Sequence, residues 1–132
     1  MWDFPGNRRL QEISQGIYEN GGVVSAVCHG VSGMLNIKLS TGDYLINGKN
    51  VTGFSNVEET VAMRRHHIPF LLEDELKKRG ARYRKAVLPY TPYVLVDGRI
   101  VTGQNPQSTR RVAQCLLQVF PQPSPQPLPG VS

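Results

Sequence analysis

The apolar run VVSAV, at residues 23–27, constrains the fold more than any other feature of the sequence. It is short and rich in β-branched residues, and it lacks the alternation of apolar and polar residues that marks a strand with one wet face. Such a run indicates a strand covered on both faces, which in practice means a parallel sheet flanked by helices. The chain offers few strands to place beside it. We therefore expect a second chain, a swapped copy or a preceding part of a longer protein to cover this strand.

Size and composition restrict the chain to one soluble globular domain. It has 132 residues, of which 39% are hydrophobic, about the size of a single core. No apolar run approaches the roughly 18 residues of a membrane span, and the N-terminus lacks the plan of a signal peptide, so we expect a cytoplasmic protein without a membrane partner. The net charge of +5 comes from scattered basic pairs among acidic residues, which argues against a nucleic-acid partner.

Periodicity and turn signals place the other elements and indicate an α/β fold. Helices are predicted over 5–20, 30–37, 71–79 and 106–120, a hairpin over 44–52 around the Asn47-Gly48 pair, and strands over 93–96 and 99–102. The apolar stripe of the last helix, Val112, Cys115, Leu116, Val119 and Phe120, predicts that Cys115 is an inert core thiol. The proline-rich stretch 121–132 is predicted to be a disordered tail.

Cys28, in the stretch AVCHG, is a candidate nucleophile. A nucleophile on a sharp strand-to-helix turn sits in a strained backbone, so the residues two positions away must be small, and here they are Ala26 and Gly30. The free N–H groups of a helix start favour the thiolate, which is the reactive form. The alternative is a buried strand-end thiol that serves only packing.

His29 and Glu59 are candidate partners of this thiol. His29 orients the thiol or shares its proton if a carboxylate holds its ring; otherwise it is a helix-end histidine satisfied by solvent. In TGFSNVEE, Ser55 and Glu58 fit a capping box, which leaves Glu59 over. From the residues alone, Glu59 is either an ordinary first-turn acid or the group that fixes His29.

No pattern in the sequence indicates a metal or a cofactor. The two cysteines form no CxxC pair and are too few for a disulfide framework. His66 and His67 are adjacent, so on a helix they point about 100° apart, and no third ligand stands at a suitable spacing. We expect both to be surface residues.

Four stretches in this order, AVCHG, GKNVTGFSNVEE, PFLLEDELKKRGA and VDGRIVTGQNPQST, resemble the ThiJ/PfpI superfamily of class I glutamine-amidotransferase-like folds. The resemblance runs from Met1 to about Phe120 and is closest to the branch of glutathione-independent glyoxalase III and its related heat-shock chaperones. It implies a three-layer flavodoxin-like sandwich with a mainly parallel sheet. Carried over residue by residue, it assigns the nucleophile to Cys28, its neighbouring histidine to His29 and the triad acid to Glu59. The turn GQNP, at residues 103–106, matches a structural turn of the family.

The sequence departs from the family at its front. In the family, MWDFP follows a glycine-rich G-G-H-G turn, and an earlier strand ends in a glutamate beside the nucleophile; this chain has neither. We therefore expect residues 1–120 to be the C-terminal part of a ThiJ/PfpI-type domain, incomplete at its N-terminal side, and 121–132 to be the tail. A homodimer or a swapped assembly would supply the missing strands.

The resemblance implies a cofactor-free conversion of a small 2-oxoaldehyde, methylglyoxal, to lactate. The Cys28 thiolate would form a hemithioacetal while His29, held by Glu59, shuttles protons. Without the family glutamate, the activity of this chain alone is expected to be weak or absent. The alternative is a holdase chaperone or a redox-sensing thiol protein without catalysis. Glutamine amidotransfer is disfavoured because neither His66 nor His67 has a glutamate two positions on; an inert gene fragment stays open.

Overall fold

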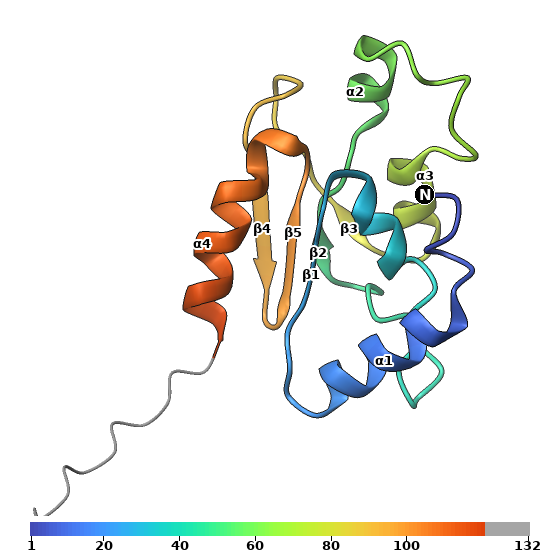
Figure 1. The fold of residues 1–132 in the computed structure, drawn as a ribbon, viewed down its shortest axis with the longest axis vertical. Helices are drawn as coiled ribbons and strands as arrows, with labels where there is room; N and C mark the ends of the chain where they lie inside the picture. The colour runs from blue at the N-terminus through green and yellow to red at the C-terminus, as the bar shows by residue number, and fades with distance from the viewer. Residues whose placement is uncertain (121–132) are drawn as a thin grey trace, which may run out of the picture.

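The computed structural model describes residues 1–120 as a small sheet with helices on both sides (Figure 1). The elements in chain order are α1 (Arg8–Glu19), β1 (Val24–Val27), the 3₁₀-helix η1 (Cys28–Met34), β2 (Asn50–Val51), α2 (Asn56–Val61), α3 (Leu72–Lys78), β3 (Arg82–Tyr83), β4 (Val94–Asp97), β5 (Ile100–Gly103), the 3₁₀-helix η2 (Pro106–Ser108) and α4 (Thr109–Val119). The tail predicted at 121–132 lies outside the described residues. No helix within 1–120 is long and apolar enough to cross a membrane.

The main sheet has the strand order β1-β5-β4. β1 runs parallel to β5, with Val24 opposite Ile100 and Val27 opposite Gly103. β4 runs antiparallel to β5 across a turn in which Gly98 has a φ of +57°. A second, two-stranded sheet pairs β2 with β3 in parallel. The predicted α/β class with parallel pairing is confirmed, and the two predicted late strands lie one residue further along the chain than expected.

Helices pack on opposite sides of the main sheet. α4 contacts all three of its strands, whereas α1 contacts β1 and η1 on the other side (Figure 1). Gly103 lets α4 approach closely, because a Cβ at this position would stand 2.6 Å from Val112 Cγ2 and 2.9 Å from Val27 Cγ2. The buried core gathers under η1 and α3, and its largest side chains include Met34, Leu35, Ile37, Leu45, Ile46, Leu72 and Leu76.

The predicted hairpin over 44–52 is wrong. Tyr44 bridges back to Lys38 instead, and β2 pairs in parallel with β3. Gly48 has a φ of +73°, but Asn47 stays outside the positive region that a type I′ turn also requires there. Burial of the neighbouring Leu45 and Ile46 in the core, together with a hydrogen bond from Gly48 N to Gly80 O (2.9 Å), outweighs the local turn preference.

Two helical predictions also need correction. The helix expected over 30–37 is the 3₁₀-helix η1, which begins at Cys28 itself. The stripe of the last helix is less buried than expected: Val112 is buried, Cys115 only half-buried, and Phe120 is 48% exposed. Cys115 is therefore only partly covered, and the prediction of a fully buried core thiol is wrong.

Candidate active site

Cys28 lies at the point where β1 turns into η1, and its backbone adopts a φ of +60°. The preceding Val27 is still extended, with φ −138° and ψ 146°. A residue other than glycine in the left-handed region is uncommon and costs about 1 to 3 kcal/mol. The strained elbow expected of a nucleophile is therefore present. The requirement for a small residue at Gly30 is wrong, since a Cβ there would meet no heavy atom of the described chain within 4 Å.

The Cys28 thiol is half-buried, and its Sγ lies 3.6 Å from Nδ1 of His29. Burial raises the pKa of the thiol, and the negative charges of Glu58 and Glu59 raise it further, against a lowering hydrogen bond from the His29 backbone. The prediction that the helix start would lower this pKa is wrong, because burial of the thiol, with the charges of the two nearby acids, outweighs the lowering effect of the His29 backbone N–H. The thiol therefore needs a base to become a thiolate.

His29 bridges the thiol and Glu59. Its Nε2 is hydrogen-bonded to Oε1 of Glu59, and its ring packs on Phe54 with the ring centroids 4.3 Å apart. A carboxylate only accepts hydrogen bonds, so opposite an ionised Glu59 the donor is Nε2, and a neutral ring then turns the lone pair of Nδ1 toward the thiol. The structure thus brings Cys28, His29 and Glu59 into one row, and Glu59 is more than an ordinary first-turn acid.

Glu59 comes to this position at the start of α2, where the capping box is formed as predicted. Ser55 Oγ accepts from Glu58 N (3.2 Å), and Glu58 Oε1 accepts from Ser55 N (3.1 Å). The same α2 turn buries Glu59, which is 1% exposed. Its second oxygen, Oε2, finds no hydrogen-bond partner in the described part of the chain.

Glu58 also forms long-range hydrogen bonds that the sequence did not reveal. It accepts from Gln104 Nε2 (2.8 Å), Asn105 Nδ2 (2.8 Å) and Tyr90 N (2.9 Å). Burial alone would raise the pKa of this carboxyl, but the hydrogen bonds outweigh burial and lower it. The turn at 103–106, which the resemblance marked as structural, is thereby fastened to the start of α2.

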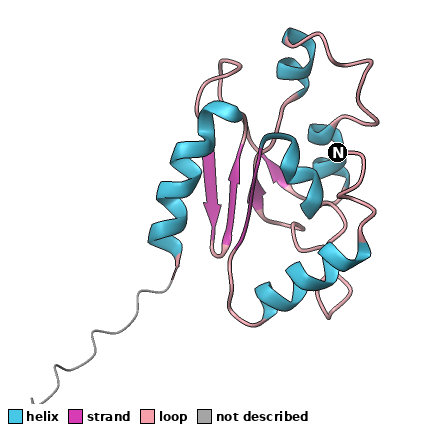
Figure 2. Ribbon diagram, viewed as in Figure 1, coloured by secondary structure: helices cyan, strands magenta, loops and turns pink. Residues whose placement is uncertain are grey.

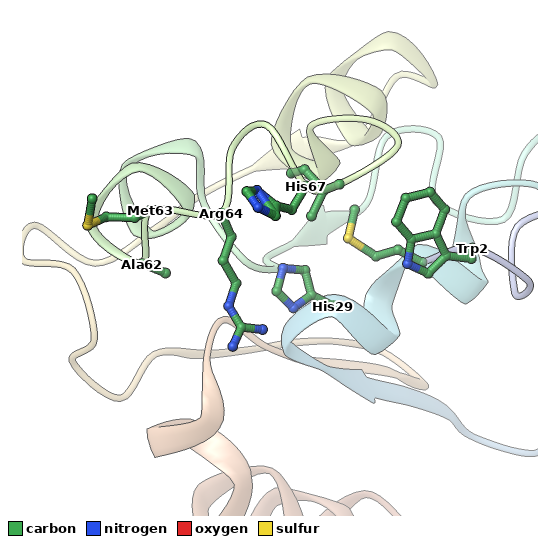
Figure 3. Close-up of a pocket in the computed structure, with 8 residues that line it drawn as sticks. Trp2, His29, Ala62, Met63, Arg64 and His67 are labelled. Carbon is green, nitrogen blue, oxygen red and sulfur yellow. The ribbon is translucent and has the colours of Figure 1, made fainter.

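An open cleft of about 630 Å³ lies beside the ring of His29 (Figure 3). Besides His29 its lining residues are Met1, Trp2, Ala62, Met63, Arg64, His67 and Ile68. Figure 2 shows that the chain between α2 and α3, which supplies most of them, is loop. His66 and His67 are exposed as predicted, but His67 also lines the cleft. No group of three or more metal-ligating side chains gathers within residues 1–120.

Sequence reasoning missed Phe54, Arg64 and Trp2 as parts of this site. For Arg64 the sequence held a weak signal, its place five residues after Glu59. In the structure the backbone N–H of Arg64 donates to the Glu59 carbonyl (3.1 Å), just beyond the end of the short α2. Nothing in the sequence pointed to Trp2, which comes from the far N-terminal end of the chain.

No family model matches the chain. Among curated proteins it is 42% identical over 120 residues to the glutathione-independent glyoxalase HSP31 of Saccharomyces cerevisiae, covering 86% of this chain and 50% of the relative. It is 36% identical over 126 residues to glyoxalase 3 of Candida albicans, covering 91% of this chain and 53% of the relative. The chain thus spans about half the length of the curated relatives it matches.

Solved structures give the same picture. The rapid encystment protein of 24 kDa from Francisella tularensis matches with a TM-score of 0.88 at 40% identity, over 92% of this chain and 53% of that one. Glyoxalase III from Candida albicans matches with a TM-score of 0.83 at 36% identity, over 91% and 52%. A ThiJ/PfpI domain protein from Brachyspira murdochii, at 21% identity and a TM-score of 0.61 over 88% and 51%, shares the fold.

Proposed function

The chain belongs to the ThiJ/PfpI superfamily, in the branch of the glutathione-independent glyoxalases, and from this premise we propose that it carries the reactive centre of a glyoxalase III-type lyase. Its substrate would be a small 2-oxoaldehyde such as methylglyoxal, and the product a 2-hydroxy acid such as lactate. The observation that carries the proposal is the row of Sγ of Cys28, the imidazole of His29 and the carboxylate of Glu59.

The geometry supports a definite order of proton movements. His29 Nδ1, with its lone pair toward the thiol, takes the proton of Cys28, and Glu59 stabilises the imidazolium that results. The thiolate then attacks the aldehyde carbon to give a hemithioacetal. Backbone N–H groups of η1, directly after the nucleophile, would stabilise the oxyanion.

The later steps need a base that moves a proton from the former aldehyde carbon to its neighbour, giving a thioester that water cleaves to the 2-hydroxy acid. In total one water molecule is added to the 2-oxoaldehyde, and no oxidant or cofactor is required. The family glutamate that would serve as this base has no counterpart in the sequence. Loss of a general base typically costs about 10² to 10⁴ in rate, so we expect slow turnover from this chain alone.

The test is an assay of the purified chain with methylglyoxal and detection of lactate. Cys28→Ala should abolish whatever turnover is found, whereas Cys115→Ala, the matched change at the other cysteine, should leave it intact. Equal turnover in the wild type and in Cys28→Ala would refute the nucleophile. Turnover as fast as that of a full-length relative would refute the need for an additional base.

The geometry does not favour the alternative of a holdase chaperone or redox-sensing thiol. Neither role requires a histidine set between the thiol and a buried carboxylate. The cytoplasmic location rests on the sequence alone and stays a prediction.

We further propose that β1 pairs with another strand in the working assembly. Within the described residues β1 bonds to β5 alone, so its other edge is open. An apolar groove of about 290 Å³ follows β1 and is walled by Phe4, Leu10 and Met34. A homodimer or a swapped assembly of this chain would cover this edge.

A further inference from the structure

The guanidinium of Arg64 projects into the cleft beside the His29 ring (Figure 3). It makes no hydrogen bond or ion pair with any residue in 1–120. The neighbouring Arg65 behaves differently, since its Nη1 reaches Thr60 Oγ1 at 3.4 Å. Arg79 is likewise paired, with Glu75 at 2.7 Å. Within residues 1–120, the Arg64 guanidinium is therefore a cation without a paired anion, and it lies next to His29 of the row formed by Cys28, His29 and Glu59.

The residues around Arg64 indicate the kind of ligand that would pair with it. His67 lies across the cleft from His29 and adds a second basic group, while Met1, Trp2 and Ile68 supply apolar surface. A planar guanidinium binds a carboxylate through two parallel N–H donors. The apolar side chains of the cleft suit a short carbon chain attached to this carboxylate.

We propose that this cleft is an anion subsite in which Arg64 anchors a carboxylate of the ligand bound at Cys28. The identification of that ligand as substrate or product rests on the proposed function. The carboxylate would belong either to the 2-hydroxy acid product or to a 2-oxoaldehyde that itself carries an acidic group. Arg64 also offsets the repulsion that Glu58 and Glu59, the acids acting on the Cys28 thiol, exert on an incoming anion.

The test compares two alkylating reagents of nearly equal shape. Iodoacetate is an anion and iodoacetamide is neutral, and the same Cys28 thiolate attacks the CH₂ carbon of either reagent and displaces iodide. The ratio of their rates is therefore independent of the thiol pKa and reports the local charge. In Arg64→Gln the ratio should fall about threefold or more, since one nearby positive charge is removed. The rates are read for the Cys28 peptide by mass spectrometry.

Arg65→Gln is the matched control. It removes the same charge from the next residue, whose side chain does not line the cleft. Its ratio should stay close to that of the wild type. An unchanged ratio in Arg64→Gln, or an equal fall in Arg65→Gln, would overturn the proposal, since the effect would then be absent or a general effect of surface charge.

The source of the carboxylate is distinguished by protection of Cys28 from iodoacetamide. Protection by lactate but not by lactamide points to the product. Glyoxal and glyoxylate both carry an aldehyde that the thiolate can attack, so stronger protection by glyoxylate than by glyoxal points to an acidic substrate; the advantage of either anion should be lost in Arg64→Gln. Protection by none of the anions would overturn the subsite. If Cys28 resists both reagents, the proposed nucleophile fails, and a lactate titration followed by the NMR signals of Arg64 and His29 still decides the subsite.

Discussion

Cys28 holds a backbone conformation that glycine adopts freely and other residues avoid, with a φ of +60° directly after β1. The strain is maintained by the residues on either side: β1 is fixed to β5, and the carbonyl of Cys28 accepts from Phe54 N at 3.5 Å. The backbone strain therefore costs stability at the position of the proposed nucleophile.

A pair of substitutions separates this strain from the loss of the thiol. Cys28→Gly and Cys28→Ala both remove Sγ, but only glycine relieves the positive φ. We expect Cys28→Gly to be more stable than Cys28→Ala by about 1 kcal/mol, measured as the free energy of unfolding in urea. A more stable Cys28→Ala would show that the backbone is relaxed at this residue.

The raised pKa of Cys28 predicts a pH dependence. The rate of alkylation by iodoacetamide should rise with pH to a midpoint above that of the same thiol in the unfolded chain, because burial and two acids disfavour the thiolate. The folded state then holds the proton more tightly. The stability linked to this thiol is therefore present below the unfolded pKa and is lost as pH rises through the folded pKa.

Cys28→Ala removes the titrating group and should flatten this alkaline loss of stability, as followed by thermal unfolding across the pH range. A native midpoint at or below the unfolded one would contradict the expected direction, and it would mean that an ion pair with His29 dominates the thiol.

At the scale of elements, the start of α2 is fastened by Glu58. One carboxylate joins the cap residue Ser55 to the turn at Gln104 and Asn105 and to the loop at Tyr90. Because Glu59 is the next residue, these hydrogen bonds of Glu58 also hold the Glu59 carboxylate in its position beside His29. Glu58 is a positioning residue, without contact to the thiol or to His29.

Glu58→Gln should destabilise the fold by about 2 to 4 kcal/mol, because an amide nitrogen would face groups that all donate. The wild type should also lose stability as pH falls through the lowered folded pKa of Glu58, and the variant should lose less there. Urea unfolding at several pH values measures both effects. Glu75→Gln, a change at a more exposed acid, is the control. If Glu58→Gln and Glu75→Gln lowered the free energy of unfolding by the same amount, the role of Glu58 would be contradicted.

The sequence was informative where the cause is local. The capping box at Ser55 and Glu58 follows from residues three apart, and the elbow after β1 from the order of strand, cysteine and helix. The sequence was uninformative where residues far apart in the chain determine the local structure. The bonds of Glu58 to Gln104 span 46 residues, and burial of Leu45 replaced the hairpin that Asn47-Gly48 favours locally. The family resemblance, rather than spacing, singled out Glu59 as the partner of His29.

At the scale of the whole molecule, the described chain leaves apolar surface without cover. Ile13 and Ile17 of α1, the helix that contacts β1, are 49% and 47% exposed, and the second edge of β1 is open within the described residues. An open edge next to apolar side chains favours association with another strand.

A proline substitution can test this edge without breaking the existing sheet. Val24 N donates to Arg99 O at 3.0 Å, so the alternation of a parallel ladder turns the N–H of Ser25 to the open side. We expect the wild type to self-associate with rising concentration in sedimentation experiments, and Ser25→Pro to stay folded but to associate less.

Ala26→Pro is the matched control, since its N–H faces β5 and its loss should destabilise the sheet. A wild type that remains monomeric at every concentration, or a Ser25→Pro variant that associates as strongly as the wild type, would argue against pairing at this edge.

The contacts among Cys28, His29 and Glu59 join residues close together in the chain: Cys28 and His29 are neighbours, and Glu59 follows His29 by only 30 residues. The pairing of β1 with β5 instead joins Val24 to Ile100, much further along the polypeptide. Closing a short loop costs less entropy than closing a long one. During folding, the acid and the imidazole can therefore meet early, before the distant strands have found their register.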